Sequence, residues 1–319
     1  MSRAPTPLRY LPTIAGLDRV YVKDESQNPS GTFKDRLIEQ AIQSSTPGTV
    51  LASISYGNTA FSLAFHLDGL KNPSLDLRGC VLVPEDWNTW RLGPSTSGNT
   101  VTGDDLRRRL EKSLTVISLP LDGPVLSDGD IAALVSERVP GRVQVRNITE
   151  GLEVPCYVEI LREAVGQLGA VPDVCLVPFG AGILCNEAKD FLAGSGCHVV
   201  ALSVGRRDSR AHMLYGPIWV DVETLESQGV ALSRHRSPDP TGAVRVPYPV
   251  HCVQEREVLS GLTRARELGL SAEPSGSVGL GVLERLADLV PECKPGSSVL
   301  VINTGNGIDS MVSGQREAL

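Results

Sequence analysis

Seven short runs of apolar, β-branched residues recur along the chain, and helical patterns lie between them. Most of these runs are uninterrupted rather than alternating, which is typical of parallel strands covered on both faces. Alternation of such strands with helices predicts an α/β fold of packed layers. The predicted strands are Arg19–Val22, Thr49–Ile54, Cys80–Val83, Leu114–Ile117, Val174–Val177, His198–Leu202 and Ser298–Ile302.

Two apolar stripes with spacings of three and four residues predict helices in the second half of the chain. The first spans Val158–Leu168 and is followed by Gly169, a residue type that commonly ends helices. The second spans Val278–Leu289, and Pro291 follows it. A third helix is expected over Val250–Leu270.

Charge and hydropathy limit the partners of the chain. It has 37 acidic and 30 basic residues, a net charge of −7. No domain-wide positive field is therefore expected, which disfavours nucleic acid as a partner. No run approaches the roughly 18 apolar residues that indicate a bilayer-spanning helix. The composition predicts neither a nucleic-acid nor a membrane partner.

The cysteines and the first residues indicate the cellular compartment. The seven cysteines, at 80, 156, 175, 185, 197, 252 and 293, include no Cys-x-x-Cys pair. Such a scattered, odd set is typical of reduced thiols rather than of disulfides or a zinc site. Residues 1–7 are too polar and proline-rich to begin a signal peptide. We therefore expect a cytoplasmic protein without a bound metal.

The first segment that indicates chemistry is residues 21–36. A strand is predicted to end near Lys23, and Asn28-Pro-Ser-Gly31 forms a turn. Thr32 can then cap a helix that begins with Lys34 in its first turn. The helix dipole opposes a cation there, and burial would lower the affinity of the amine for its proton. Both effects favour an amine nucleophile.

Three further predicted strands end in turns rich in glycine, asparagine, serine and threonine. They are Ser53–Ala60, Val177–Lys189 and Val301–Gly307. An open α/β sheet binds its ligand at the carboxyl ends of its strands, and amides at a helix start can hold a phosphate. The run Gly180-Ala-Gly182 lacks both the Gly-Lys-Ser/Thr of a Walker loop and the third glycine of a dinucleotide fingerprint. An amine beside a cradle for one phosphate fits an aldehyde cofactor that bears a phosphate.

Residues 23–36 read Lys-x-Glu-x-x-Asn-Pro-Ser-Gly-Thr-Phe-Lys-Asp-Arg, which resembles the signature of fold-type II pyridoxal-phosphate enzymes, the tryptophan synthase β-like family. Four more motifs match in order: Ser55-Tyr-Gly-Asn-Thr, the glycine turn at 180, Glu273-Pro-Ser-Gly-Ser and Thr304-Gly-Asn-Gly. They span nearly the whole chain and fade across 86–150 and 204–250. The resemblance implies pyridoxal 5'-phosphate as cofactor and a two-domain α/β fold. Each domain would be an open, twisted, mostly parallel sheet flanked by helices.

The resemblance also implies roles for individual residues. Lys34 would bond covalently to the cofactor aldehyde and later act as acid and base at the substrate Cα. Asn58 would hydrogen-bond the ring hydroxyl, and Thr304 would face the pyridine nitrogen. The phosphate would be held by Gly180, Ala181, Gly182 and Ile183. The substrate would be contacted by Ser55, Tyr56 and Thr59.

The neutral hydroxyl of Thr304 bears on the reaction. Unlike an aspartate, it does not enforce protonation of the ring, which is then a weaker electron sink. Elimination or replacement at the β or γ carbon of an L-amino acid is therefore expected. The Thr304-Gly-Asn-Gly segment is most similar to threonine synthase, which indicates O-phosphohomoserine or a related activated amino acid.

Two departures from threonine synthase keep other substrates open. Ile148 and Glu153 stand where threonine synthases typically carry arginine and lysine, so a basic fork for a substrate phosphate is missing. Tyr56 replaces a small hydroxyl residue beside the substrate carboxylate, where it either acts as an acid or base or fills space. The alternatives are elimination or replacement on serine, threonine or O-activated serine, and a non-catalytic pyridoxal-phosphate-binding protein.

The resemblance also suggests how the chain divides. Residues 1–45 and 148–319 would form the large cofactor-binding domain, and 46–147 a small mobile domain. Closure of the small domain over the substrate would exclude water. The resemblance implies a homodimer.

Overall fold

The computed structural model describes residues 3–55, 57–70, 73–85, 91–92, 101–119, 126–141, 143–149, 151–180, 182–204, 218–219, 230–233, 243–245 and 248–307. Its larger sheet has six strands in the order β1-β2-β15-β9-β10-β14. All neighbours pair in parallel except β1 and β2. The strands are β1 (Leu8–Leu11), β2 (Arg19–Asp24), β9 (Val174–Pro178), β10 (His198–Val204), β14 (Val250–Val253) and β15 (Ser298–Asn303).

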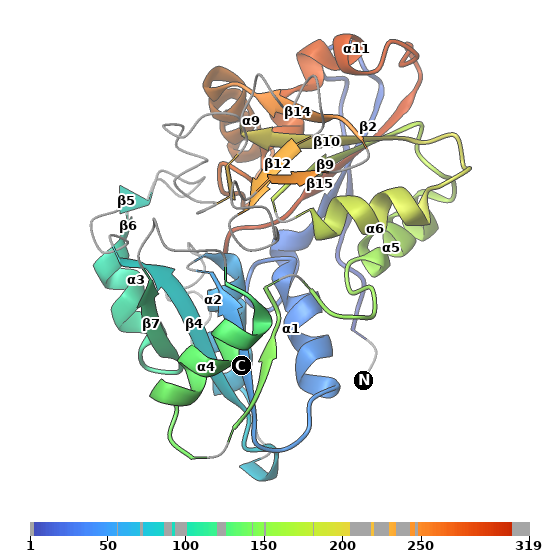
Figure 1. Cartoon of the computed structure of the whole chain (residues 1–319). Helices are drawn as coiled ribbons and strands as arrows, with labels where there is room; N and C mark the ends of the chain where they lie inside the picture. The colour runs from blue at the N-terminus through green and yellow to red at the C-terminus, as the bar shows by residue number, and fades with distance from the viewer. Residues whose placement is uncertain are drawn as a thin grey trace.

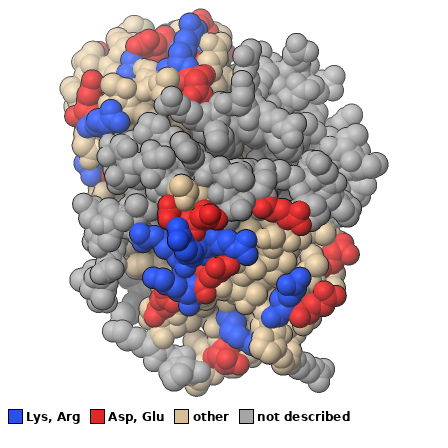
Figure 2. Space-filling model, turned by 90° about the vertical axis from the view of Figure 1, so that its left-hand side faces the viewer, with Lys and Arg blue, Asp and Glu red and all other residues tan. Residues whose placement is uncertain are grey.

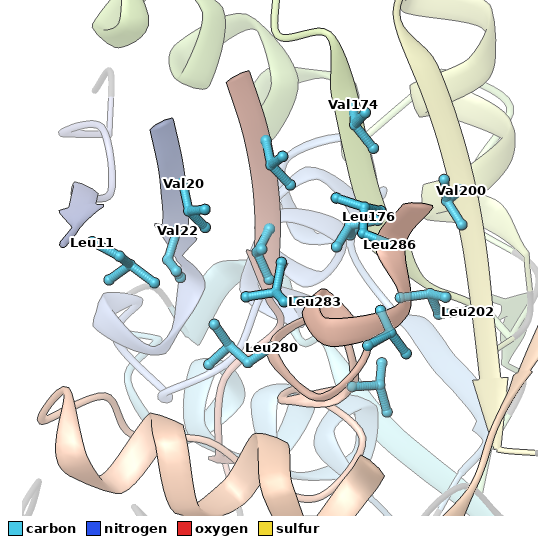
Figure 3. Close-up of a cluster of buried hydrophobic side chains, with 14 of the residues drawn as sticks. Leu11, Val20, Val22, Val174, Leu176, Val200, Leu202, Leu280, Leu283 and Leu286 are labelled. Carbon is cyan, nitrogen blue, oxygen red and sulfur yellow. The ribbon is translucent and has the colours of Figure 1, made fainter. Parts of the chain in front are cut away.

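Helices cover both faces of the six-stranded sheet (Figure 1). One face packs on α9 (Glu255–Glu267), α10 (Val278–Gly281) and α11 (Leu286–Leu289). Figure 3 shows Leu280 and Leu283 of this layer beside Val22 and Leu176 of the strands. The other face packs on α5 (Val158–Leu168) and α6 (Ile183–Phe191). Two apolar layers therefore bury the central strands β9 and β15 on both faces, which explains their uninterrupted hydrophobic runs.

The smaller sheet has four parallel strands in the order β7-β4-β3-β8. They are β3 (Thr49–Ile54), β4 (Arg78–Pro84), β7 (Thr115–Leu119) and β8 (Gln144–Asn147). One face packs on α2 (Asn58–Asp68) and α3 (Gly103–Leu110), and the other on α4 (Asp128–Arg138). The four strands lie within the predicted small domain, but its boundaries and mobility stay predictions.

Helix α1 (Lys34–Gln43) packs into both halves of the molecule. Leu37 belongs to the core of the six-stranded sheet, whereas Ile38 and Ala41 belong to the core of the four-stranded sheet. The remaining elements described are short: η1 (Glu25–Gln27), η2 (Pro73–Leu75), β5 (Arg91–Leu92), β6 (Val101–Thr102), β11 (Ile218–Trp219), β12 (Val230–Ser233), β13 (Ala243–Arg245) and η4 (Leu283–Arg285).

The predicted α/β fold with mostly parallel sheets is confirmed. All seven predicted strands are present, with ends within two residues of those expected. The helix over 158–168 is confirmed as well, and Gly169 ends it with a left-handed φ of 73°. None of the helices described is long and apolar enough to cross a bilayer.

Two helix predictions were wrong in part. The Val278–Leu289 stripe forms α10, a 3-10 turn and α11 instead of one helix. Gly281, at the end of α10, packs closely on α9: a Cβ at this position would lie 2.1 Å from the Glu257 carbonyl oxygen. The Val250–Leu270 prediction fails at its start, where Val250–Val253 pairs with β10 as a strand.

The charged face of α3 is internally paired. Arg107 bonds to Glu111 at 2.7 Å, and Arg108 bonds to Asp105 at the same distance. Figure 2 shows a cluster of basic side chains bordered by acidic ones on the side of the molecule where α3 lies. Such exposed pairs contribute little to stability.

Candidate active site

The turn before α1 places Lys34 at the first position of that helix. The Gly31 amide donates to the Asn28 carbonyl at 2.8 Å, and the Phe33 amide donates to the Thr304 carbonyl at 3.0 Å. The N-cap is Phe33 rather than the expected Thr32, although the Lys34 amide does donate to the Thr32 hydroxyl at 3.4 Å. The start of α1 is therefore bound directly to the loop that follows β15.

Two aromatic rings flank the Lys34 amine. Its Nζ lies 4.6 Å from the ring centroid of Phe33 and 5.4 Å from that of Tyr157. Ring faces at these distances attract a cation. Tyr157 is fully buried, and its hydroxyl has no hydrogen-bond partner among the residues described. Burial raises the pKa of Tyr157 far above its ordinary value, so the phenol stays protonated.

Asn58 begins α2 and joins it to two loops of the six-stranded sheet. The Gly307 amide donates to Asn58 Oδ1 at 3.1 Å, and Asn58 Nδ2 donates to Glu273 Oε1 at 2.8 Å. Because a backbone amide can only donate, the Gly307 contact fixes which way the Asn58 amide points. An amide nitrogen carries two hydrogens, so Nδ2 has a second one for a further acceptor.

The loop Thr304–Gly307 lies against the turn before α1. Gly305 has a φ of 100°, and a Cβ there would lie 2.2 Å from the Gly31 carbonyl oxygen. The Asn306 amide donates to that same oxygen at 2.8 Å. Thr304 is buried, and a Cβ on Gly276 would lie 3.2 Å from its hydroxyl oxygen. Glycines thus allow three loops to meet around Thr304.

The predicted phosphate turn lies between β9 and α6. β9 pairs with β15, so Gly180, two residues after the end of β9, lies just past the strand beside the one that leads to Thr304. Gly182 is the N-cap of α6, has a φ of 83°, and Ile183 opens the helix. The first amides of a helix point outward and suit an anion. Ala181 lies outside the described residues.

A carboxylate on α6 connects that helix to the surroundings of Lys34. Glu187 accepts hydrogen bonds from the amides of Cys156, Tyr157 and Val158 at 3.1, 2.6 and 2.6 Å. It therefore caps α5, whose own N-cap, Tyr157, supplies no side-chain bond. Burial first, and then the charge of Glu187, raise the pKa of Cys156 to about 12 despite the opposing charge of Lys34. The Cys156 thiol is thus not a nucleophile near neutral pH.

The predicted substrate residues lie near the start of α2. The Ser55 amide donates to the Leu82 carbonyl at 3.2 Å, and the Ser55 hydroxyl accepts from the Gly57 amide at 3.4 Å. Thr59 is buried in the first turn of α2. Tyr56 lies outside the described residues. Ser55 and Thr59 therefore flank the start of α2, where Asn58 lies.

The signature around Lys34 also builds a buried ion network that sequence reasoning missed. Arg36 binds Glu25 through two nitrogens at 2.8 Å each, and Glu163 at 2.8 and 2.9 Å. Lys23 Nζ donates to Glu163 Oε2 at 2.6 Å. Although burial alone would raise it, hydrogen bonds from Arg36 and Lys23 lower the pKa of Glu163 to about 2. The lysine, glutamate and arginine of the signature that flank Lys34 thus hold its helix in place.

Asp35 adds a second support by joining α1 to α2. Its carboxylate accepts from the Ser62 hydroxyl at 2.6 Å and lies 3.2 Å from His66 Nε2. The Ser30 amide and hydroxyl also donate to it.

Among the residues described, no cluster of histidine, cysteine, aspartate or glutamate could hold a metal ion.

The convergent groups fit pyridoxal phosphate. They include an amine at Lys34, an oriented amide at Asn58, a buried hydroxyl at Thr304 and a glycine-capped helix start at Gly182. Residues 1–305 match the family described as pyridoxal-phosphate dependent enzyme. The chain belongs to this family, and its cofactor is pyridoxal phosphate.

Two relatives and several solved structures are similar to the chain. A threonine synthase of Synechocystis sp. is 27% identical over 95% of this chain and 76% of its own. A threonine synthase of Halalkalibacterium halodurans is 23% identical over 91% of this chain and 78% of its own. The L-serine ammonia-lyase of Rhizomucor miehei is 17% identical with a TM-score of 0.59, covering 95% and 94%. The O-acetylserine dependent cystathionine beta-synthase of Helicobacter pylori is 18% identical with a TM-score of 0.60, covering 97% and 95%. Identities this low to solved structures establish the fold alone.

Proposed function

We propose that this chain is a lyase-type enzyme that eliminates or replaces a group at the β or γ carbon of an L-amino acid. The observation that carries the proposal is the convergence of Lys34, Asn58 and Thr304. The Thr304 carbonyl holds the Phe33 amide beside Lys34, and the same loop holds the Asn58 amide through Gly307. When bound, pyridoxal phosphate supplies an aldehyde for an amine and a ring that withdraws electrons from the adjacent carbon.

Each residue has a definite part in this proposal. Lys34 would hold the cofactor aldehyde and would move the proton at the substrate Cα. Asn58 would donate to the ring hydroxyl, and Thr304 would offer a neutral hydroxyl to the pyridine nitrogen, which would favour loss of a leaving group. Gly180, Ala181, Gly182 and Ile183 would hold the phosphate. Ser55, Tyr56 and Thr59 would contact the substrate.

The substrate we propose first is an activated amino acid of the kind used by threonine synthase, because both curated relatives carry that name. The segment 148–153 favours a second candidate. Ile148 is fully buried in the core of the four-stranded sheet, and Glu153 is an exposed acid. Neither offers a cation to a substrate phosphate, so elimination or replacement on serine, threonine or O-activated serine is the alternative. We also propose that two copies of this chain form a homodimer and that the protein is cytoplasmic.

Product analysis separates these reactions. Purified protein loaded with pyridoxal phosphate is incubated separately with O-phosphohomoserine, L-serine, L-threonine and O-acetylserine. Phosphate together with threonine from O-phosphohomoserine supports the first substrate. Pyruvate or 2-oxobutyrate from the others supports the second. Loaded protein that converts none of them, and whose visible spectrum no amino acid changes, would contradict the proposal and favour a non-catalytic binding protein.

A further inference from the structure

Glu273 is a buried carboxylate in the motif Glu-Pro-Ser-Gly-Ser, to which sequence reasoning assigned no role. Only 7% of the residue is exposed. Its Oε1 accepts from Asn58 Nδ2 at 2.8 Å and from the Ser275 hydroxyl at 2.6 Å. Its own amide donates to the Gly305 carbonyl at 3.3 Å. Glu273 therefore contacts both the loop that carries Thr304 and the helix that carries Asn58.

These contacts constrain the Asn58 amide at both ends. The Gly307 amide binds its oxygen, and the Glu273 carboxylate binds its nitrogen. A hydrogen bond to a charged acceptor is stronger than a neutral one, and burial strengthens it further. Because both ends of the Asn58 amide are held, its second Nδ2 hydrogen points in one direction. The Asn58 side chain then loses little conformational entropy when that hydrogen binds an acceptor. The same pair joins α2 of the four-stranded sheet to a loop of the six-stranded sheet.

We propose that Glu273 is a positioning residue that aims the Asn58 amide at the cofactor ring hydroxyl and thereby couples helix α2 to the cofactor. This inference rests on the proposed role of Asn58. The carboxylate acts through Asn58 rather than on the substrate. Loss of Glu273 should therefore loosen both the cofactor and the first turn of α2, whereas a side chain that still accepts the Asn58 bond should preserve both.

The test compares Glu273→Ala, Glu273→Gln and the wild type. Glutamine retains an oxygen acceptor for Asn58, whereas alanine removes it. The matched control is Glu257→Ala. Glu257 is similarly buried, with 8% of the residue exposed, and it accepts hydrogen bonds from the Gln254 amide and from Arg285. It lies on α9, which covers the face of the six-stranded sheet opposite α5 and α6. The readouts are the dissociation constant of pyridoxal phosphate, the visible spectrum of the loaded protein, and hydrogen exchange at the first turn of α2 without cofactor.

We expect Glu273→Ala to raise the dissociation constant roughly 10- to 100-fold, the cost of leaving the partly buried Asn58 donor without its acceptor, and to shift the visible spectrum. Glu273→Gln should stay within about 3-fold, and Glu257→Ala should change stability but not the constant. If Glu273→Ala does not fold, Ser275→Ala, which removes the second donor to Oε1, should give a smaller rise. An unchanged constant and unchanged α2 exchange in Glu273→Ala would overturn the inference. Wild-type protein that takes up no cofactor would instead overturn the proposed function and this inference with it, while the exchange measurement would still decide whether Glu273 holds the first turn of α2.

Discussion

The buried network around Arg36 makes a quantitative prediction about acid stability. Glu163 accepts from two nitrogens of Arg36 and from Lys23, and its side chain is 8% exposed. These bonds outweigh burial and lower its pKa from 4.5 to about 2. At about 1.4 kcal/mol per pKa unit, the ionised carboxylate contributes on the order of 3 kcal/mol to folding at pH 7.

The sign of the pH dependence follows from the depressed pKa. The unfolded chain binds a proton at higher pH than the folded chain does, so this stability is fully present above about pH 4.5. It decreases as the pH falls toward 2, and roughly half or more of it is lost by pH 3. Replacement by Glu163→Gln leaves two buried cations with Glu25 alone, which costs about 3–5 kcal/mol at pH 7.

Urea unfolding followed by circular dichroism at pH 7, 5, 4 and 3 measures this contribution. The matched control is Glu159→Gln on the same helix, where an exposed carboxylate pairs with Arg162. The control should stay within about 0.5 kcal/mol of the wild type. The difference between the wild type and Glu163→Gln should shrink as the pH falls. A difference below about 1 kcal/mol at pH 7, or one unchanged at pH 3, would refute the reasoning.

Two further substitutions test the loops and the cap. Gly305→Ala should destabilise the protein by more than about 3 kcal/mol and weaken cofactor binding, because its Cβ would meet the Gly31 carbonyl at 2.2 Å. Gly296 also has a positive φ, 90°, but a Cβ there would meet no atom within 4 Å. Gly296→Ala should therefore lower the free energy of unfolding, measured by thermal denaturation, by only about 1 kcal/mol. Equal losses in the two variants would contradict the steric argument. Glu187→Ala should cost about 2–3 kcal/mol in urea unfolding and speed hydrogen exchange at residues 156–158, because three amides lose their acceptor. Unchanged exchange there would show that α5 needs no cap from α6.

The strands could be predicted because their chemistry is local. A run such as Val174–Val177 is short and apolar throughout, which suits a strand covered on both faces. The ion network could not be found this way, because Glu163 lies on an amphipathic helix and reads as a solvated surface charge. Only the fold brings it to Arg36, and the same is true of Tyr157 beside Lys34. The prediction for residues 278–289 was wrong because the apolar spacing there is helical, although the segment is not one helix. The close packing of Gly279 and Gly281 on neighbouring residues depends on the fold and cannot be predicted from that spacing.

The central claim is that the amine of Lys34 carries the cofactor. Purified protein is loaded with pyridoxal phosphate, reduced with borohydride and digested, and the modified peptide is sequenced by mass spectrometry. We predict a reduced pyridoxyl-phosphate adduct on Lys34 in the wild type, and its loss together with the visible absorbance in Lys34→Ala. An adduct on another lysine, or a colourless protein with no adduct, would contradict the account.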